Sequence, residues 1–222
     1  MNTATTDLTP AQRTHLGERL QAGCAALGIA PTAAQHDQLI DYLQLLLRWN
    51  RAYNLTAIKD RTSWVTRHLL DSLAILPWIG DERVIDVGTG AGLPGVPLSI
   101  MRPKAHFALL DSNGKKTRFL FQVTTQLGLG NVEIVEARVE TYYPDVVFDA
   151  VVSRAFASLS DMVHSCLHLL TSEGRLLALK GAQADAEVTD YGSNNDTDLH
   201  CVDIHTLRVP DLHEARSLVE LR

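Results

Sequence analysis

Short apolar segments alternate with helical segments between residues 83 and 180, and this alternation restricts the fold more than any other feature. The apolar segments span residues 83–87, 106–110, 132–135, 148–152 and 175–179. Nearly continuous apolar residues are typical of strands buried on both faces of a parallel sheet. The intervening segments 113–128 and 158–170 have apolar residues at helical spacing. The sequence therefore predicts an α/β fold with an open, mostly parallel, doubly wound sheet.

The first third of the chain predicts helices only. Thr9-Pro10 and Thr32 are typical helix starts, and Asp60 begins a third helix that Pro77 ends, with a loop over residues 51–59 between the second and third. After residue 180 we expect an exposed helix and loop over 182–198, then two strands near 200–208 and 216–221. These boundaries predict a helical extension over residues 1–78 and an α/β domain over residues 79–222.

Composition excludes several classes of protein. The 222 residues are 45% apolar and 21% charged, which is typical of a globular chain, and no apolar stretch is long enough to span a bilayer. Residues 1–10 lack the features of a secretion signal, so we expect a cytoplasmic protein. The three cysteines Cys24, Cys166 and Cys201 are far apart, and we expect them to be reduced. We also expect a monomer.

The net charge of −6 is unevenly distributed. Residues 182–222 hold nine acidic and three basic residues, which accounts for the whole net charge. Residues 102–118 hold one acid and five bases, Arg102, Lys104, Lys115, Lys116 and Arg118. Such a run is explained either by a solvated helix face or by a phosphate-containing partner.

The segment 84–95 contains the end of the first predicted strand and a glycine-rich loop that precedes a helix. In open α/β sheets, ligands bind at the carboxyl ends of the strands, where this loop lies. Gly90, Gly92 and Gly95 match the dinucleotide-binding pattern, and Asp111 follows at the distance expected of a ribose-binding acid. A glycine-rich turn without a ligand is a further alternative.

The same loop also reads Asp-x-Gly-x-Gly-x-Gly from Asp86 through Gly88 and Gly90 to Gly92, which resembles the first motif of class I S-adenosylmethionine (SAM) methyltransferases. A carboxylate at Asp86 suits a cofactor that carries an ammonium and a sulfonium. Asp111 can accept hydrogen bonds from ribose hydroxyls with either cofactor.

Several further blocks make the likeness more specific. They span residues 49–56, 67–73, 86–98, 110–116, 153–157 and 180–181. In these blocks the chain closely resembles the bacterial small-subunit ribosomal RNA guanine-N7 methyltransferases, the RsmG or GidB family. The resemblance implies a class I, Rossmann-like fold and methyl transfer from SAM to N7 of the guanine conventionally numbered 527 in 16S rRNA. The substrate is naked rRNA, an assembly intermediate or the 30S subunit.

The resemblance also implies which residues contact SAM. Gly88 would offer its backbone to the methionine part, Leu93 would line the pocket, and the pair Val139-Glu140 would flank the adenine. Arg154, at the end of the fourth predicted strand, would lie beside both SAM and the target base. With the residues of the loop, the predicted cofactor site comprises Asp86, Gly88, Gly90, Leu93, Asp111, Val139, Glu140 and Arg154.

Methylation at N7 constrains the chemistry. N7 of guanine has a lone pair and no proton to lose, so the reaction needs positioning rather than a general base or nucleophile. We assign no catalytic residue and keep Arg154 as a candidate for positioning the base. Lys115, Lys116 and Arg118 are candidates for RNA contact, because cations in the first turns of a helix are disfavoured by its dipole.

Other side chains carry weaker signals. His68 and Asp71 lie three residues apart and either contact the cofactor pocket or form a hydrogen-bonded pair. We expect no metal site, although two groups have suggestive spacing: His164 with His168, and His200 with Cys201 and His205. Trp49, Trp64 and Trp78 suit the core better than base stacking.

Three other functions stay open from sequence alone. They are a SAM-dependent methyltransferase for another substrate, an NAD-dependent oxidoreductase, and an RNA-binding protein without activity.

Overall fold

The helical extension begins with two helices that start at threonine caps. In the computed structural model, which describes residues 7–58, 60–194, 197 and 199–222, these are α1 (Pro10–Ala26) and α2 (Ala33–Tyr53). Thr9 and Thr32 each accept a hydrogen bond from the backbone of a glutamine three residues on, whose side chain bonds back to the cap. The loop predicted from residue 51 starts later, because α2 continues to Tyr53 and ends at Asn54 in a left-handed conformation.

The prediction of one regular helix from Asp60 to Pro77 is wrong. The chain instead forms short turns: η1 (Arg61–Ser63), η2 (Val65–Leu70), α3 (Asp71–Leu73) and η3 (Leu76–Trp78). The segment η2 is a π-helix, whose wider turn is closed by a hydrogen bond from the Asp71 amide to the Thr66 carbonyl. Such turns occur frequently at functional sites.

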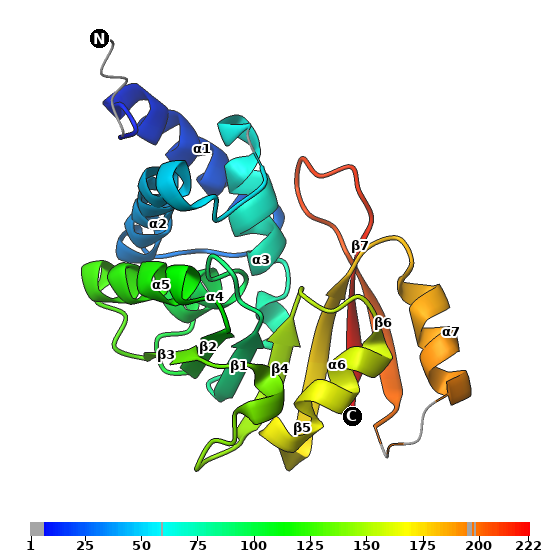
Figure 1. Ribbon diagram of the computed structural model, residues 1–222. Helices are drawn as coiled ribbons and strands as arrows, with labels where there is room; N and C mark the ends of the chain where they lie inside the picture. The colour runs from blue at the N-terminus through cyan, green and yellow to red at the C-terminus, as the bar shows by residue number, and fades with distance from the viewer. Residues whose placement is uncertain (1–6, 59, 195–196, 198) are drawn as a thin grey trace.

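The sheet confirms the predicted α/β class. The described part of the chain forms seven strands in the order β3-β2-β1-β4-β5-β7-β6. Their bounds are β1 (Arg83–Val87), β2 (His106–Asp111), β3 (Val132–Glu136), β4 (Phe148–Ser153), β5 (Leu170–Lys180), β6 (Cys201–Leu207) and β7 (Arg216–Leu221). Strands β1 to β5 are parallel, whereas β7 runs antiparallel to both of its neighbours. The two last strands therefore form a hairpin at one edge (Figure 1).

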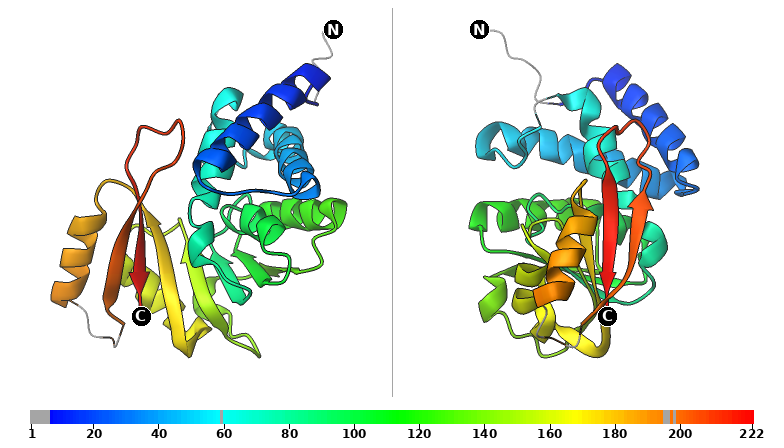
Figure 2. Two further views of the ribbon diagram at one scale, coloured as in Figure 1. Left: turned by 180° about the vertical axis from the view of Figure 1, so that it is seen from behind. Right: turned by 90° about the vertical axis from the view of Figure 1, so that its right-hand side faces the viewer.

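Helices cover both faces of the sheet (Figures 1 and 2). They are α4 (Gly95–Met101), α5 (Gly114–Leu127), α6 (Leu159–Cys166) and α7 (Ala184–Asn194). The predicted helix over 158–170 ends earlier, at Cys166, because Leu170 already pairs with Phe148 as the first residue of β5. In the segment 182–198 the predicted helix is present as α7, and residues 195, 196 and 198 lie outside the described residues.

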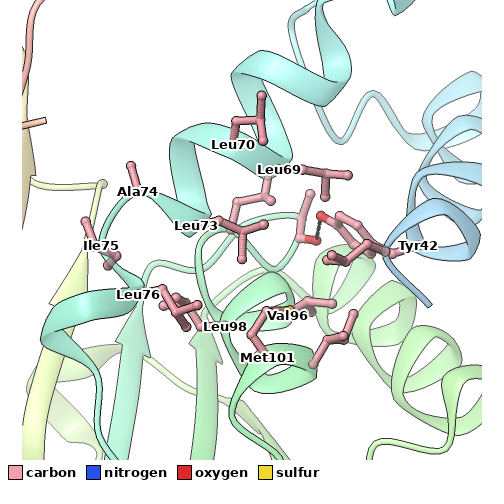
Figure 3. Close-up of a cluster of buried hydrophobic side chains, with 14 of the residues drawn as sticks. Tyr42, Leu69, Leu70, Leu73, Ala74, Ile75, Leu76, Val96, Leu98 and Met101 are labelled. Atoms are coloured by element: carbon pink, nitrogen blue, oxygen red, sulfur yellow. Dashed lines mark hydrogen bonds between the residues drawn. The ribbon is translucent and has the colours of Figure 1, made fainter. Parts of the chain in front are cut away.

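Two apolar clusters lie on opposite faces of the sheet, and successive strand residues alternate between them. One cluster joins α1, α2 and α3 to α4 and α5, and the other lies under α6 and α7. Figure 3 shows Leu69, Leu70 and Leu73 beside Val96 of α4 and Tyr42 of α2. The helical extension therefore shares a core with the α/β part, and its division at residue 78 stays a prediction.

The Tyr42 hydroxyl ties this extension to the glycine loop. It is completely buried and donates a 2.8 Å hydrogen bond to the Ala91 carbonyl. We expect Tyr42→Phe to lower the free energy of unfolding by about 1 kcal/mol, because a buried acceptor loses its donor. Urea unfolding measures this loss. Tyr143→Phe, on an exposed ring, is the matched control and should unfold like the wild type; equal stability of both variants would contradict the assignment.

Candidate cofactor and nucleic-acid site

Two adjoining cavities lie where the parallel strands end. The larger, about 530 Å³, is bordered by the glycine loop, α3, residues 55–58 and the ends of β4 and β5. The smaller, about 270 Å³, lies between the ends of β1, β2 and β3. Gly88 and Ala155 line both cavities, so one extended ligand can occupy the two together.

The glycine loop turns sharply between β1 and α4. Gly88, Gly90 and Gly92 have φ of 70°, 63° and 92°, a region that side chains disfavour. The Gly88 amide donates a 2.9 Å hydrogen bond to the Leu110 carbonyl, which attaches the loop to β2. A Cβ on Gly95 would lie 2.2 Å from the Leu109 side chain, so only glycine allows α4 to lie this close to the sheet.

From the sequence, Asp86 is expected to face the cofactor, whereas the structure places its carboxylate beneath the loop. It is 0% exposed and lines neither cavity. One carboxylate oxygen, Oδ2, accepts hydrogen bonds from the Thr89 hydroxyl at 2.6 Å and the Gly95 amide at 2.8 Å. Asp86 shares a strand face with Val84, which packs toward α4, so it points into the core. Burial raises the pKa of Asp86 to about 6 against the lowering effect of these two bonds.

Asp111 ends β2 and lines the smaller cavity. Its carboxylate accepts hydrogen bonds from the backbone amides of Gly90 at 3.0 Å and Asn113 at 2.9 Å. The Lys116 ammonium completes the arrangement, 3.1 Å from Asp111 Oδ2. The carboxylate is therefore held in one orientation at the wall of the cavity.

The other predicted cofactor residues lie at the two cavities. Gly88, Gly90, Leu93 and Arg154 line the larger one. Val139 and Glu140 line the smaller one, opposite the loop that carries Asp111. The structure thus brings these residues together around the paired cavities, as the resemblance implies; their contact with a cofactor stays a prediction.

Charged residues gather at the larger cavity. Asp71 of α3 is buried and binds two guanidinium groups, Arg154 at 2.9 Å and Arg216 at 3.0 Å. Arg67 and Lys180 line the same cavity. One buried carboxylate thus pairs with two arginines. The positive charge at the wall of the larger cavity is therefore only partly balanced.

Sequence reasoning missed Arg216 as a site residue. It lies in the part of the chain outside the matching blocks, and only the antiparallel direction of β7 brings its first residue to the edge where the parallel strands end. Lys180 and Arg67 lie inside matching blocks, and these blocks were the signal that could have identified them.

The acidic end of the chain balances part of this charge. Glu187 of α7 lies 2.6 Å from the Lys180 ammonium, and Glu214 pairs with Arg67. Asp211 lies 3.6 Å from Arg19 of α1. The acidic segment therefore contacts the cations of the larger cavity and of the helical extension, although Asp196 and Asp198 lie outside the described residues.

His68 lines the larger cavity without pairing with Asp71, which binds the two arginines instead. Its Nε2 lies 3.3 Å from the Thr56 hydroxyl, and its ring packs against Trp64. Burial first, and then the charge of Arg154, lower the pKa of His68 to about 4. The ring is therefore neutral at pH 7.

The basic run does not form one patch. Arg102 donates to the carbonyls of Ile79 and Leu76, and exposed Lys104 precedes β2, at the opposite end of that strand from Asp111. The two therefore lie away from the cavities. Lys116, a predicted RNA contact, points to Asp111 instead of outward. Lys115 and Arg118 are the exposed pair on α5.

The described residues contain no group of three or more His, Cys, Asp or Glu side chains arranged to hold a metal ion. His164 contacts the Ser160 carbonyl and His168 the Tyr142 carbonyl. Trp64 is buried, as expected of a core residue. No helix within the described part of the chain is long and apolar enough to cross a membrane.

The sheet order, the helices on its two faces and the glycine loop define a class I SAM-dependent methyltransferase fold. A SAM-dependent methyltransferase from Aquifex aeolicus superposes with a TM-score of 0.58 at 16% identity, covering 76% of this chain and 96% of that one.

Sequence relatives identify one family within this class of methyltransferases. The model of the family described as rRNA small subunit methyltransferase G (GidB) matches residues 35–219. A ribosomal RNA small subunit methyltransferase G of Saccharophagus degradans is 47% identical over 95% of this chain and 92% of its own length. The corresponding protein of Pseudomonas syringae is 46% identical over 92% and 94%. The chain belongs to the rRNA small subunit methyltransferase G family.

The buried carboxylate of Asp86 should make stability depend on pH. Its pKa is about 6 in the folded chain against 3.8 for an ordinary aspartate, so the folded state binds the proton more tightly. Asp86 therefore contributes stability that is fully present below about pH 4 and is lost as the pH rises toward about 6.

We expect the free energy of unfolding of the wild type, minus that of Asp86→Asn, to fall across this window and to level off above it. Urea unfolding of both proteins at successive pH values measures the difference. A difference that rises with pH would show that the folded state favours the charged carboxylate.

Proposed function

We propose that this protein transfers the methyl group of SAM to N7 of guanine in 16S rRNA, at the position its family resemblance implies. The observation that carries the proposal is the pair of adjoining cavities in a chain of this family. One cavity holds an oriented carboxylate, and the other holds a cluster of cations. A nucleoside-containing cofactor suits the first, and the target nucleotide with its phosphate suits the second.

The residues present fit SAM. The Asp111 carboxylate, fixed by two backbone amides, can accept hydrogen bonds from both ribose hydroxyls. Gly88 carries no side chain at the junction of the cavities, where a Cβ would meet the Ala155 side chain at 2.5 Å. Val139 offers an apolar surface to the adenine ring. When bound, SAM supplies an electrophilic methyl group on a sulfonium.

The same geometry speaks against a dinucleotide. A pyrophosphate binds the free amides at a helix N-terminus. In α4 these amides are already used, since Gly95 donates to Asp86 and Val96 donates to the Gly92 carbonyl. Pro97 has no amide proton to offer. The contact between a pyrophosphate and free backbone amides, on which the dinucleotide motif depends, is therefore not available at α4. This argues against an oxidoreductase.

The chain's own residues provide binding and orientation in the proposed reaction. Guanine N7 needs no deprotonation, so neutral His68 and the paired Asp71 need not act as bases. Arg154, fixed by Asp71, can donate to the target base or to its phosphate. Positioning the base in line with the methyl group accounts for catalysis.

The partner and location follow from the same proposal. The substrate is 16S rRNA, in the 30S subunit or in an assembly intermediate, and the base must be unpaired or flipped to enter the larger cavity. We propose that the chain acts in the cytoplasm as a monomer and without a metal ion.

Incubation of the purified protein with methyl-labelled SAM and unmodified 16S rRNA tests the function, both as naked RNA and as 30S subunits. We expect the label to be incorporated into the RNA. Strand cleavage after borohydride and aniline treatment then locates the N7-methylguanine. SAM binding without methylation of either RNA would favour another substrate. Binding of NAD instead of SAM would favour an oxidoreductase.

Asp111→Asn tests the cofactor site. We expect the dissociation constant of SAM to rise about tenfold, because a neutral amide replaces a charged acceptor of ribose hydrogen bonds. Isothermal titration calorimetry measures the constant. Asp81→Asn, an exposed acid before β1, is the control and should bind SAM like the wild type. Unchanged binding by Asp111→Asn would remove this carboxylate from the site.

A further inference from the structure

The outward surface of α5 carries two cations and an aromatic ring in a row. Lys115, Arg118 and Phe121 are all exposed and follow one another at intervals of three residues, which places them as neighbours on one side of the helix. Phe121 is 67% exposed. We call these three residues the α5 face.

Exposure to solvent alone does not account for the cations and the aromatic ring of the α5 face. The first turn of α5 has no acidic residue, and the helix dipole disfavours cations there. Neither Lys115 nor Arg118 forms an ion pair with any residue that the structure describes, in contrast to Lys116. Arg118 uses its Nε to bind the Gly114 carbonyl. An exposed phenylalanine beside two cations without an ion pair among the described residues indicates a partner that carries both negative charge and flat apolar surfaces.

The α5 face begins at the rim of the candidate site. Lys116, which follows Lys115, lines the smaller cavity. Trp49 of α2 joins the buried side of α5 to Tyr53, because its ring lies 5.7 Å from Phe119 and 5.2 Å from Tyr53. Tyr53 is 42% exposed, and the residues after it, 55–58, line the larger cavity.

We infer that the α5 face binds an unpaired strand of the rRNA next to the target guanine. Lys115 and Arg118 bind its phosphates, and Phe121 stacks on one of its bases. Cations interleaved with exposed aromatic rings are the usual means of holding single-stranded nucleic acid without reading its sequence. The inference rests on the proposed function, because it takes rRNA as the substrate and adds a second region of contact outside the cavities.

Binding of a labelled, unstructured oligoribonucleotide of about ten nucleotides, followed by fluorescence anisotropy over a series of salt concentrations, tests the inference. We expect Phe121→Leu to weaken binding about tenfold without changing the salt dependence, and Phe121→Trp to restore it. The double variant Lys115→Gln, Arg118→Gln should make the slope of log affinity against log salt shallower by about 1.4, the value for two single-strand phosphate contacts.

Matched controls lie elsewhere on the chain. Tyr143→Leu removes another exposed ring, and Lys104→Gln another exposed cation, and both should bind the oligonucleotide like the wild type. SAM affinity should be unchanged in every variant, which shows that each one is folded.

The inference is overturned if Phe121→Leu binds like the wild type or if the double variant keeps the wild-type salt slope. It is also overturned if the variants bind the oligonucleotide normally but no longer methylate 30S subunits, since the face would then contact folded RNA or a protein. If the wild type methylates no rRNA while the variants still lose oligonucleotide binding, the proposed function fails and the single-strand surface stands.

Discussion

The hydrogen bonds of the buried Asp86 carboxylate are the interaction on which the site depends. By accepting from Thr89 and Gly95, this carboxylate fixes both ends of the turn between β1 and α4. The loop from Gly88 to Gly95 is thereby held against the end of β1, where Gly88 borders both cavities. A group that is costly to bury is kept in the core because it replaces the side-chain contacts that a glycine loop cannot make.

The second constraint is the balance of charge around the larger cavity. Asp71 binds two arginines, and acids from the end of the chain bind Lys180 and Arg67. These contacts hold the cations in defined places while leaving the wall positive. The whole-chain charge of −6 is therefore a poor guide to partners, because acids near the site serve to position its cations.

Much of the fold could be predicted because its signals are local. Continuous apolar runs located the strands, and Thr9 and Thr32 located two helix starts. The π-helical η2 could not be predicted, since no local pattern of residues indicated its wider turn. The same limit applies to β5, whose early start depends on pairing with β4.

The site was predictable where the chain resembles its family and less so elsewhere. Residues of the matching blocks line the two cavities, but Arg216 enters through an antiparallel strand that gives no local signal. Asp86 was assigned to the wrong surface, although its place on the same strand face as Val84 indicated that it points under α4. The direction of Lys116 depends on Asp111, a contact between two elements that spacing does not reveal.

The paired cavities, in the function we propose, serve to methylate N7 of one guanine in 16S rRNA. The most direct measurement is borohydride and aniline cleavage of 16S rRNA from cells in which the gene has been deleted. We predict that cleavage at that guanine disappears and that returning the intact gene restores it. If cleavage persists at the same guanine in the deleted cells, this protein is not the enzyme that methylates it.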